Sequence, residues 1–264
     1  DTFYVCDSIQ NRILQYTNGE ITVLTGGKSG HEDGDMKDAL FCNPYGITMD
    51  FDGNLLVTDY HHVRKINLKE HFVQTVAGCT TEFSNSGYRD GEASEAQFSF
   101  PSAIVVHKDG SVLVADKGNH CIRKIQNGTV STFDGSPASP GFRFQQGPNF
   151  KSIFPFPEGL ALDNHDNLLV LDDSRLHKVN LNYLKVMTYP LKMREIHSLA
   201  MDKRGTVFIG RSRLYRVYNT WDTERYLWLA HLKEDPSYCE LARLPKDILR
   251  ELAAHLAYLT KRSY

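Results

Sequence analysis

Five related segments follow one another along the chain, and in each a short apolar run ends at a polar residue and a turn. The third segment reads IVVHKDGSVLVADKGNHCIRKI and spans residues 104–125. Successive run-ending residues lie 52, 57, 56 and 39 positions apart. Periods of this length are typical of an array of repeated supersecondary units. The residues that end the runs are Asp7, Asp59, Asp116, Asp172 and Arg211.

The order of parts within a unit predicts four antiparallel strands. A short apolar strand leads into an Asp-Gly type of turn, which is a strong hairpin signal. The second strand is continuous in Val and Leu, and this pattern favours burial on both faces. A turn, a third strand with basic residues and a more polar fourth strand complete the unit. We expect Val57, Val114 and Val170, at equal offsets from the repeated aspartate, to be buried in equivalent positions.

Four-stranded sheets that are covered on both faces by their neighbours are the blades of a β-propeller. We therefore predict an all-β propeller of about five to six blades, whose ring this chain need not complete, followed by a short α-helical segment. The predicted domains are residues 1–233 for the propeller and residues 234–264 for the helical segment.

The stretch VLVADKGNHCIRKI resembles the core of the NHL repeat, and the Asp-Gly, Ala, Phe and Pro pattern of residues 30–44 and 87–101 is similar to its connections. The resemblance covers roughly residues 2–218 and implies an NHL-type propeller. Because the first unit begins at its second strand, we expect either further sequence upstream or a strand borrowed from residues 225–232. That segment is alternatively the fourth strand of the fifth unit.

Recurrence of the aspartates favours a structural role, since a residue repeated in every blade is not a single catalytic site. We predict that Asp7, Asp59, Asp116 and Asp172 accept hydrogen bonds from backbone N–H groups of the turn that follows each. Residues 33–35 and 90–92 are mildly similar to calcium loops, but they lack the acidic ligands at two-residue steps. We expect them to form turns.

No catalytic motif is present: the sequence lacks a nucleophile elbow, a phosphate loop and a dinucleotide fingerprint. Some lyases with NHL-like propellers hold a metal through histidines, and the turn with His61 and His62 is loosely similar. No carboxylate–histidine spacing supports a metal centre. We therefore predict no enzymatic activity, no metal and no cofactor, with a metal-dependent lyase or a lactonase-like hydrolase as the alternative.

The charge balance does not favour nucleic acid, because 30 basic residues meet 32 acidic ones and the net charge is −2. Basic residues recur on the third strands, and we expect them to pack along blade edges by their aliphatic stems. Single-stranded RNA binding is a second alternative. No apolar run reaches the length of about 18 residues that a membrane span needs. The basic residues concerned are Arg64, Lys65, Arg123, Lys124, Lys178 and Arg216.

The favoured function is a non-catalytic protein-interaction scaffold, because binding residues concentrate on loops that a rigid scaffold holds. We expect another protein to bind the turns between the second and third strands. The candidate binding residues are Tyr60, His61, His62, Lys117, Asn119, His120, Ser174 and Arg175.

The five cysteines are far apart and odd in number, so they form neither a disulfide framework nor a zinc spacing. We expect buried or half-buried free thiols and, from these, an intracellular compartment.

The end of the chain changes period. The run LPKDILRELAAHL, residues 244–256, predicts an amphipathic helix and is similar to the start of an F-box. That resemblance implies recruitment of cullin-type ubiquitin ligases, which would make the propeller a substrate-binding module. The alternative is a helix that packs on the propeller or leads into a further domain. The F-box-like residues are Leu244, Pro245, Ile248, Leu249, Leu252 and Leu256.

Overall fold

The structure is a computed structural model, and it describes residues 2–79, 86–135, 154–172, 175–182, 186–191, 198–201, 207–210, 214–217 and 229–231. The chain divides into two compact units, residues 1–157 and 158–264. Each unit is described by itself.

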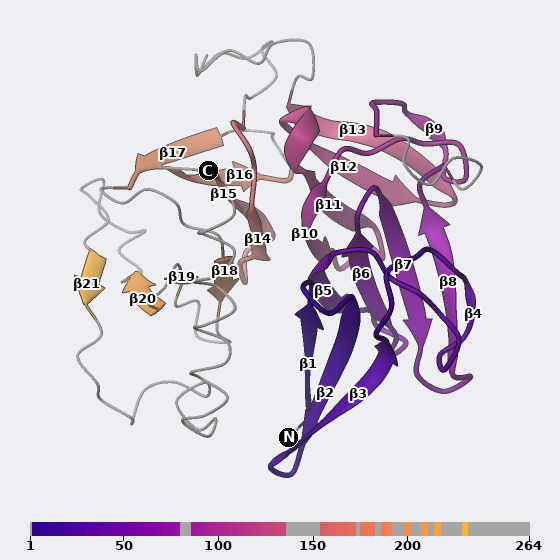
Figure 1. The fold of residues 1–264 in the computed structure, drawn as a ribbon. Helices are drawn as coiled ribbons and strands as arrows, with labels where there is room; N and C mark the ends of the chain where they lie inside the picture. The colour runs from indigo at the N-terminus through magenta and orange to yellow at the C-terminus, as the bar shows by residue number, and fades with distance from the viewer. Residues whose placement is uncertain are drawn as a thin grey trace. The chain divides into compact units, whose positions relative to one another are not determined.

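Unit 1 contains three antiparallel sheets, and β5 packs between β1 and β10 of the neighbouring sheets (Figure 1). The first sheet is β1 (Thr2–Asp7), β2 (Arg12–Thr17) and β3 (Glu20–Gly26). The second is β5 (Pro44–Met49), β6 (Leu55–Asp59), β7 (His62–Asn67) and β8 (Phe72–Ala77), with β4 (Gly34–Asp35) beside β8. The third is β10 (Pro101–Val106), β11 (Val112–Asp116), β12 (Cys121–Gln126) and β13 (Thr129–Gly135), with β9 (Gly91–Glu92) beside β13. A 3-10 turn, η1 (Lys117–Asn119), joins β11 to β12.

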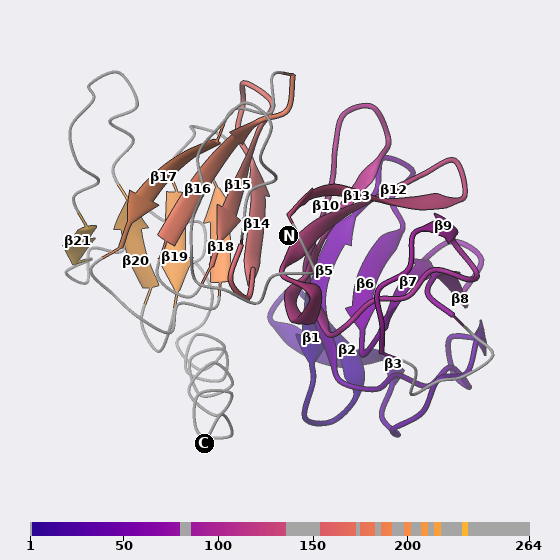
Figure 2. The same ribbon diagram turned by 90° about the horizontal axis from the view of Figure 1, so that it is seen from above.

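Unit 2 contains two four-stranded antiparallel sheets (Figure 2), and their strands β14 and β18 are in contact. The first is β14 (Gly159–Leu162), β15 (Asn167–Leu171), β16 (Arg175–Asn180) and β17 (Val186–Pro190). The second is β18 (Ser198–Met201), β19 (Val207–Gly210), β20 (Leu214–Val217) and β21 (Leu229–His231). Strand β21 pairs with β20, so part of residues 225–232 forms the outer strand of this sheet.

The predicted strand order within each sequence repeat is confirmed. Val57, Val114 and Val170 have no exposed surface, and the second strands β6 and β15 are buried along their whole length. Asp166 replaces the turn glycine in the fourth unit with φ of 57°, a conformation that Asp tolerates better than most residues. Apolar side chains of neighbouring sheets in unit 1 share cores, for example Val57 with Ile13 and Phe41.

The first sheet has three strands in the described residues, as expected for a unit that begins at its second strand. One detail of the strand count differs from the four-strand prediction. In the next two sheets the connection from the preceding blade adds the two-residue strands β4 and β9 to the outer edge. This correction has a physical cause, because an outer edge strand has unpaired N–H and C=O groups that a passing segment can satisfy.

The predicted domain boundary after residue 233 and the F-box-like helix lie outside the described residues, and both stay predictions. Within the described ranges, no helix is long and apolar enough to cross a bilayer. The cysteines described are free thiols, half-buried at Cys6, Cys42 and Cys79 and buried at Cys121, as the sequence predicts.

Candidate functional site

The repeated aspartates of the second and third sheets are buried and each binds an arginine from the third strand. Asp59 accepts a hydrogen bond from Arg64 at 3.0 Å, and Asp116 accepts one from Arg123 at 2.8 Å. All four side chains have no exposed surface. Burial raises the pKa of Asp59 to about 7 and that of Asp116 to about 6, because desolvation of the carboxylate outweighs the attraction of its neighbours.

The same two arginines also bind aspartates in the connections between blades. Arg64 donates to Asp33 at 2.7 Å, and Arg123 donates to Asp90 at 2.6 Å. A threonine at the same place in each outer strand donates its backbone N–H to the aspartate. Thr75 of β8 donates to Asp33 at 2.8 Å, and Thr132 of β13 donates to Asp90 at 3.0 Å. The Asp-Gly segments therefore fasten the connection to the following blade.

The prediction that the repeated aspartates accept turn amides is correct for two of the four. Asp7 accepts the N–H of Gln10, and Asp172 accepts the N–H of Arg175. Asp59 and Asp116 instead accept backbone N–H groups of the preceding connection. The donors are Cys42 at 2.7 Å for Asp59 and Ser99 at 2.8 Å for Asp116.

The expectation of a basic ladder along the blade edges is wrong for Arg64 and Arg123, which are interior residues. The lysines that follow Arg64, Arg123 and His177 on the third strands have a different environment, because successive side chains of a strand point to opposite faces. Each lysine pairs with an aspartate of its blade's first hairpin. The pairs are Lys65 with Asp50 at 2.9 Å, Lys124 with Asp109 at 3.6 Å and Lys178 with Asp163 at 2.9 Å.

A second repeated interaction is a hydrogen bond from the backbone N–H of the residue before the proline at the end of each connection. Phe100 and Phe156 have φ of 48° and 49°, and their backbone N–H groups donate to Nδ1 of His61 and His120, both at 3.2 Å. In the first repeat Asn43 has φ of 57° and donates in the same way to the Asn11 side chain at 2.8 Å. Each ring of a His–Phe pair also contacts the other edge to face, with centroids 4.6 Å apart.

These histidines are neutral acceptors. Burial, followed by the nearby His62, lowers the pKa of His61 to about 4. Burial also lowers the pKa of His120. A protonated imidazole has no acceptor nitrogen, so the hydrogen bond to the Phe100 amide requires the neutral form.

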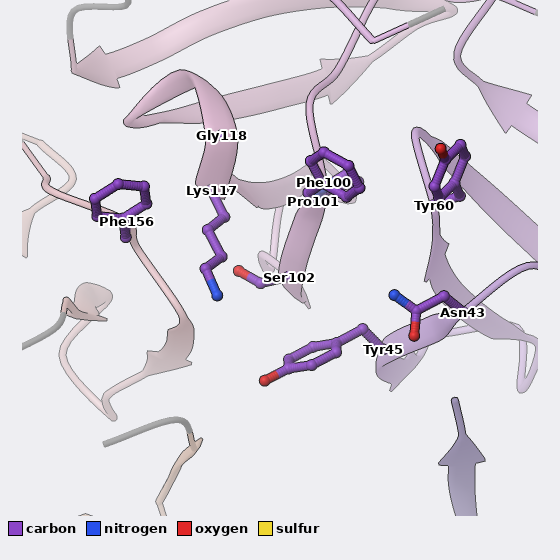
Figure 3. A pocket seen from close by; sticks show the side chains of 9 residues that line it. All are labelled: Asn43, Tyr45, Tyr60, Phe100, Pro101, Ser102, Lys117, Gly118 and Phe156. Carbon is purple, nitrogen blue, oxygen red and sulfur yellow. The ribbon is translucent and has the colours of Figure 1, made fainter. Parts of the chain in front are cut away.

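A pocket of about 260 Å³ opens where these equivalent positions meet in unit 1 (Figure 3). The lining consists of residues before, at and after the proline, and of the two residues that follow the repeated aspartate. The lining residues are Asn43, Tyr45, Tyr60, Phe100, Pro101, Ser102, Lys117, Gly118 and Phe156.

Four of the nine residues that line this pocket are aromatic, and contacts outside the pocket hold its wall in place. Tyr60 packs edge to face on Phe100, with ring centroids 5.5 Å apart. The hydroxyl of Ser102, near the start of β10, donates a hydrogen bond to the carbonyl oxygen of Pro157 at 2.7 Å. This bond holds the start of β10 beside the pocket. In Figure 3 the amine of Lys117 and the ring of Tyr45 extend into the same space.

Of the loop residues proposed from the sequence, Tyr60 and Lys117 line the pocket. His61 and His120 lie behind it and hold Phe100 and Phe156. The other loop residues lie elsewhere or are outside the described residues. His62 is buried against Cys79, Asn119 binds the carbonyl of Gly87, Arg175 begins β16, and Ser174 is outside the described residues.

Sequence reasoning missed the residues around the prolines, above all Tyr45, Phe100 and Phe156. Their signal was present, because a proline recurs at one offset in successive connections and its two neighbours vary. Among the described residues, no group of three or more His, Cys, Asp or Glu side chains is arranged to hold a metal ion.

Blades of four antiparallel strands, repeated and covered by their neighbours, define a protein of the β-propeller class. The NHL repeat model matches residues 98–125, and the repeated Asp and the third-strand basic residues recur in the units of Asp59 and Asp172. Residues 98–125 are therefore an NHL repeat, and the neighbouring repeats are similar to it.

Two relatives support this identification. The chain is 28% identical over 213 residues to human NHL repeat-containing protein 2, a match that covers 70% of this chain and 28% of that protein. It is 31% identical over 135 residues to the Arabidopsis thaliana protein SUPPRESSOR OF QUENCHING 1, chloroplastic, covering 46% of this chain and 12% of that protein. The matches therefore span less than a third of the length of these relatives.

Among solved structures, the chain is similar to a catalytically inactive virginiamycin B lyase from Staphylococcus aureus with quinupristin. The TM-score is 0.55 with 13% sequence identity, and the match covers 89% of this chain and 67% of the lyase. At this identity the likeness establishes the propeller fold and nothing of the activity.

Proposed function

We propose that this chain is a non-catalytic interaction scaffold that binds a segment of another protein in the aromatic pocket of unit 1. The observation that carries the proposal is the convergence of equivalent repeat positions on that pocket. Tyr45, Tyr60, Phe100 and Phe156 present four rings there. Buried aromatic anchors in a small, well-packed depression are typical of the residues that dominate protein–protein affinity.

The backbone behind the rings supports this proposal, because a preformed site loses little conformational entropy on binding. The His61 and His120 acceptors hold the backbones of Phe100 and Phe156. The volume of about 260 Å³ lies below the range of roughly 300–1,000 Å³ that is common for small-molecule sites, so it suits one or two anchoring side chains.

The competing proposal is a metal-dependent lyase or hydrolase. The nine lining residues, all in the described part of unit 1, include no histidine and no carboxylate. Such a set offers no Cys, His or carboxylate ligand for zinc, and for calcium it offers carbonyl oxygens such as that of Asn43 without the carboxylates that usually accompany them. One zinc or calcium ion retained per purified chain would favour the enzyme instead.

The proposal is tested by selecting a phage-displayed library of random dodecapeptides against the chain. Enriched peptides are then measured on two phenylalanine variants of similar exposure, because Phe100 is 48% exposed in the pocket and Phe72 is 43% exposed on β8. We expect Phe100→Asn to lose the peptides and Phe72→Asn to keep them. Absence of any enriched peptide, or equal loss in both variants, would overturn the proposal.

A more specific form of the proposal makes the propeller the substrate-binding module of a ubiquitin-ligase-type complex inside the cell. It rests on the F-box-like run at residues 244–256 alone. The test is binding of the chain to a purified F-box adaptor subunit by analytical gel filtration. We expect a complex that Leu244→Asp with Pro245→Ala prevents, and no complex with the unaltered chain would dismiss this form.

A further inference from the structure

Two equivalent clusters of unit 1 hold the connections between blades, and one contacting residue differs between them. His31 Nε2 lies 3.3 Å from the hydroxyl oxygen of Thr75. The hydroxyl of Tyr88 forms the same contact with Thr132 in the next blade. His31 and Tyr88 stand at the same offset, two residues before the aspartate of the connection. The first clamp is the set Asp33, Asp59, Arg64 and Thr75, and the second clamp is the set Asp90, Asp116, Arg123 and Thr132.

His31 is a neutral hydrogen-bond acceptor beside the first clamp. Its side chain is 10% exposed, and its Nδ1 lies 3.2 Å from a terminal nitrogen of Arg64. Because a guanidinium can only donate, this bond requires an unprotonated Nδ1. The imidazole also stacks on His62, with ring centroids 3.9 Å apart, and Nδ1 lies 4.0 Å from a carboxylate oxygen of Asp59. Burial, followed by His62 and Arg64, lowers the pKa of His31 to about 3. The charge of Asp33 acts against this lowering.

The two clamps therefore respond differently to acid. Histidine is the side chain whose charge ordinarily changes between pH 5 and 8, whereas tyrosine has no such change. In the second clamp the guanidinium of Arg123 lies over the Tyr88 ring, 4.8 Å from its centroid. Burial raises the pKa of Asp59 and that of Asp116, so protonation of these carboxylates favours both closed clamps as the pH falls. Protonation of His31 opposes closure of the first clamp.

The first clamp continues into the wall of the aromatic pocket. Asp59 accepts the backbone N–H of Cys42 at 2.7 Å. The next residue, Asn43, donates its own N–H to the side chain of Asn11 at 2.8 Å, and it lines the pocket together with Tyr45. Release of the connection at Cys42 therefore reaches residues that line the pocket.

We propose that His31 makes the first clamp sensitive to acid, so that its protonation loosens residues 31–42 and the pocket wall at Asn43 and Tyr45. A protonated imidazole offers no acceptor to Arg64 and sets a second cation 3.2 Å from the guanidinium, where like charges repel each other. The clamp itself rests on the contacts described above, and its effect on a bound ligand rests on the proposed function.

Amide hydrogen exchange of Cys42 and Asn43 at pH 7.5 and pH 5 tests the inference. It compares the unaltered chain with His31→Tyr, which introduces the residue of the second clamp. With a pKa of 6.5 in the open state and about 3 in the closed state, His31 should lower the protection factors about thirtyfold at pH 5 relative to pH 7.5. We expect His31→Tyr to lack this thirtyfold loss, since Asp59 is present in both chains and its contribution cancels. The Ser99 amide, which Asp116 accepts, should have the same pH dependence in both.

The reciprocal variant Tyr88→His should confer the additional loss on the Ser99 amide and leave the Cys42 amide unchanged. Equal pH dependence of the Cys42 amide in the unaltered chain and in His31→Tyr would overturn the inference. A peptide selected on the chain should lose more affinity between pH 7.5 and pH 5 with the unaltered chain than with His31→Tyr. Equal affinity losses would overturn the control of the pocket and leave the proposed function standing. A library that yields no peptide would overturn the proposed function, while the exchange measurements still decide whether the clamp responds to acid.

Discussion

Arg123 donates a hydrogen bond to Asp116 at 2.8 Å, and both side chains are fully buried. The surface pair of Arg89 and Glu95 has the same N–O distance of 2.8 Å, with side chains 58% and 60% exposed. The two pairs therefore differ in burial and not in length. Removing one partner of a buried pair leaves an uncompensated charge in the interior, whereas an exposed charge is solvated by water.

We predict that Arg123→Met lowers the free energy of unfolding by about 3–5 kcal/mol. The matched surface variant Arg89→Met should change it by less than about 1 kcal/mol. Urea unfolding at pH 7 measures both. In the double variant with Asp116→Asn, we expect the loss to be smaller than the sum of the single losses, because no unpaired charge remains buried: Asp90, which also loses Arg123, has a side chain that is 43% exposed. Equal losses for Arg123→Met and Arg89→Met would contradict the prediction.

The strands could be predicted from the sequence because their signals are local. Continuous Val and Leu before each repeated aspartate, and the hairpin turns around them, depend on neighbouring residues alone. The role of Arg123 could not be predicted in the same way, because Asp90 and the Gln97 carbonyl that bind it lie in the preceding connection. The recurrence of that Asp-Arg combination in the previous unit was the available signal.

The candidate site was predicted in part for the same reason. Tyr60 and Lys117 follow the repeated aspartate directly and were found from the turn pattern. Phe100 and Phe156 come from connections far along the chain, and they line the pocket together with those residues. Contacts between segments so distant in sequence have no local pattern in the sequence.

The Thr58 hydroxyl links the second sheet of unit 1 to the third. We predict that this link contributes measurably to the free energy of unfolding. This hydroxyl accepts the N–H of Gly46 at 2.8 Å and donates to the carbonyl oxygen of Ser102 at 3.1 Å. Thr58→Val preserves the shape and removes the partner of a part-buried N–H and of a buried carbonyl, so it should cost about 1–3 kcal/mol in urea unfolding. The exposed control Thr22→Val on β3 should stay within about 0.5 kcal/mol.

His61 should make the stability depend on pH. Its pKa is lowered from 6.5 to about 4, so the unfolded chain binds more protons between these values. Stability from this residue is therefore full above pH 6.5 and is lost as the pH falls toward 4. At pH 5 the loss amounts to roughly 2 kcal/mol relative to pH 7.5.

The variant His61→Asn separates this titration from the hydrogen bond. Asn11 accepts the equivalent amide in the first repeat, so Asn at position 61 should keep the acceptor and reduce the difference between unfolding free energies at pH 7.5 and pH 5. His61→Ala should reduce that difference too, but with lower stability at both pH values, since the Phe100 amide loses its partner. A pH dependence unchanged in His61→Asn would show that other groups, such as His31 and His62, account for it.

Because of its backbone conformation, position 100 should tolerate Asn better than Val, the reverse of the order expected in a β-strand. With φ of 48° this residue occupies the left-handed region, which Asn tolerates and β-branched residues avoid. Phe100→Asn should therefore stay within about 1 kcal/mol of the unaltered chain, and Phe100→Val should lose about 1–3 kcal/mol. Phe72 has similar exposure but lies on β8, where extended backbone favours Val over Asn. We expect urea unfolding to rank Asn above Val at position 100 and Val above Asn at position 72. The same ranking at both positions would mean that the left-handed backbone at Phe100 does not decide which side chain is tolerated there.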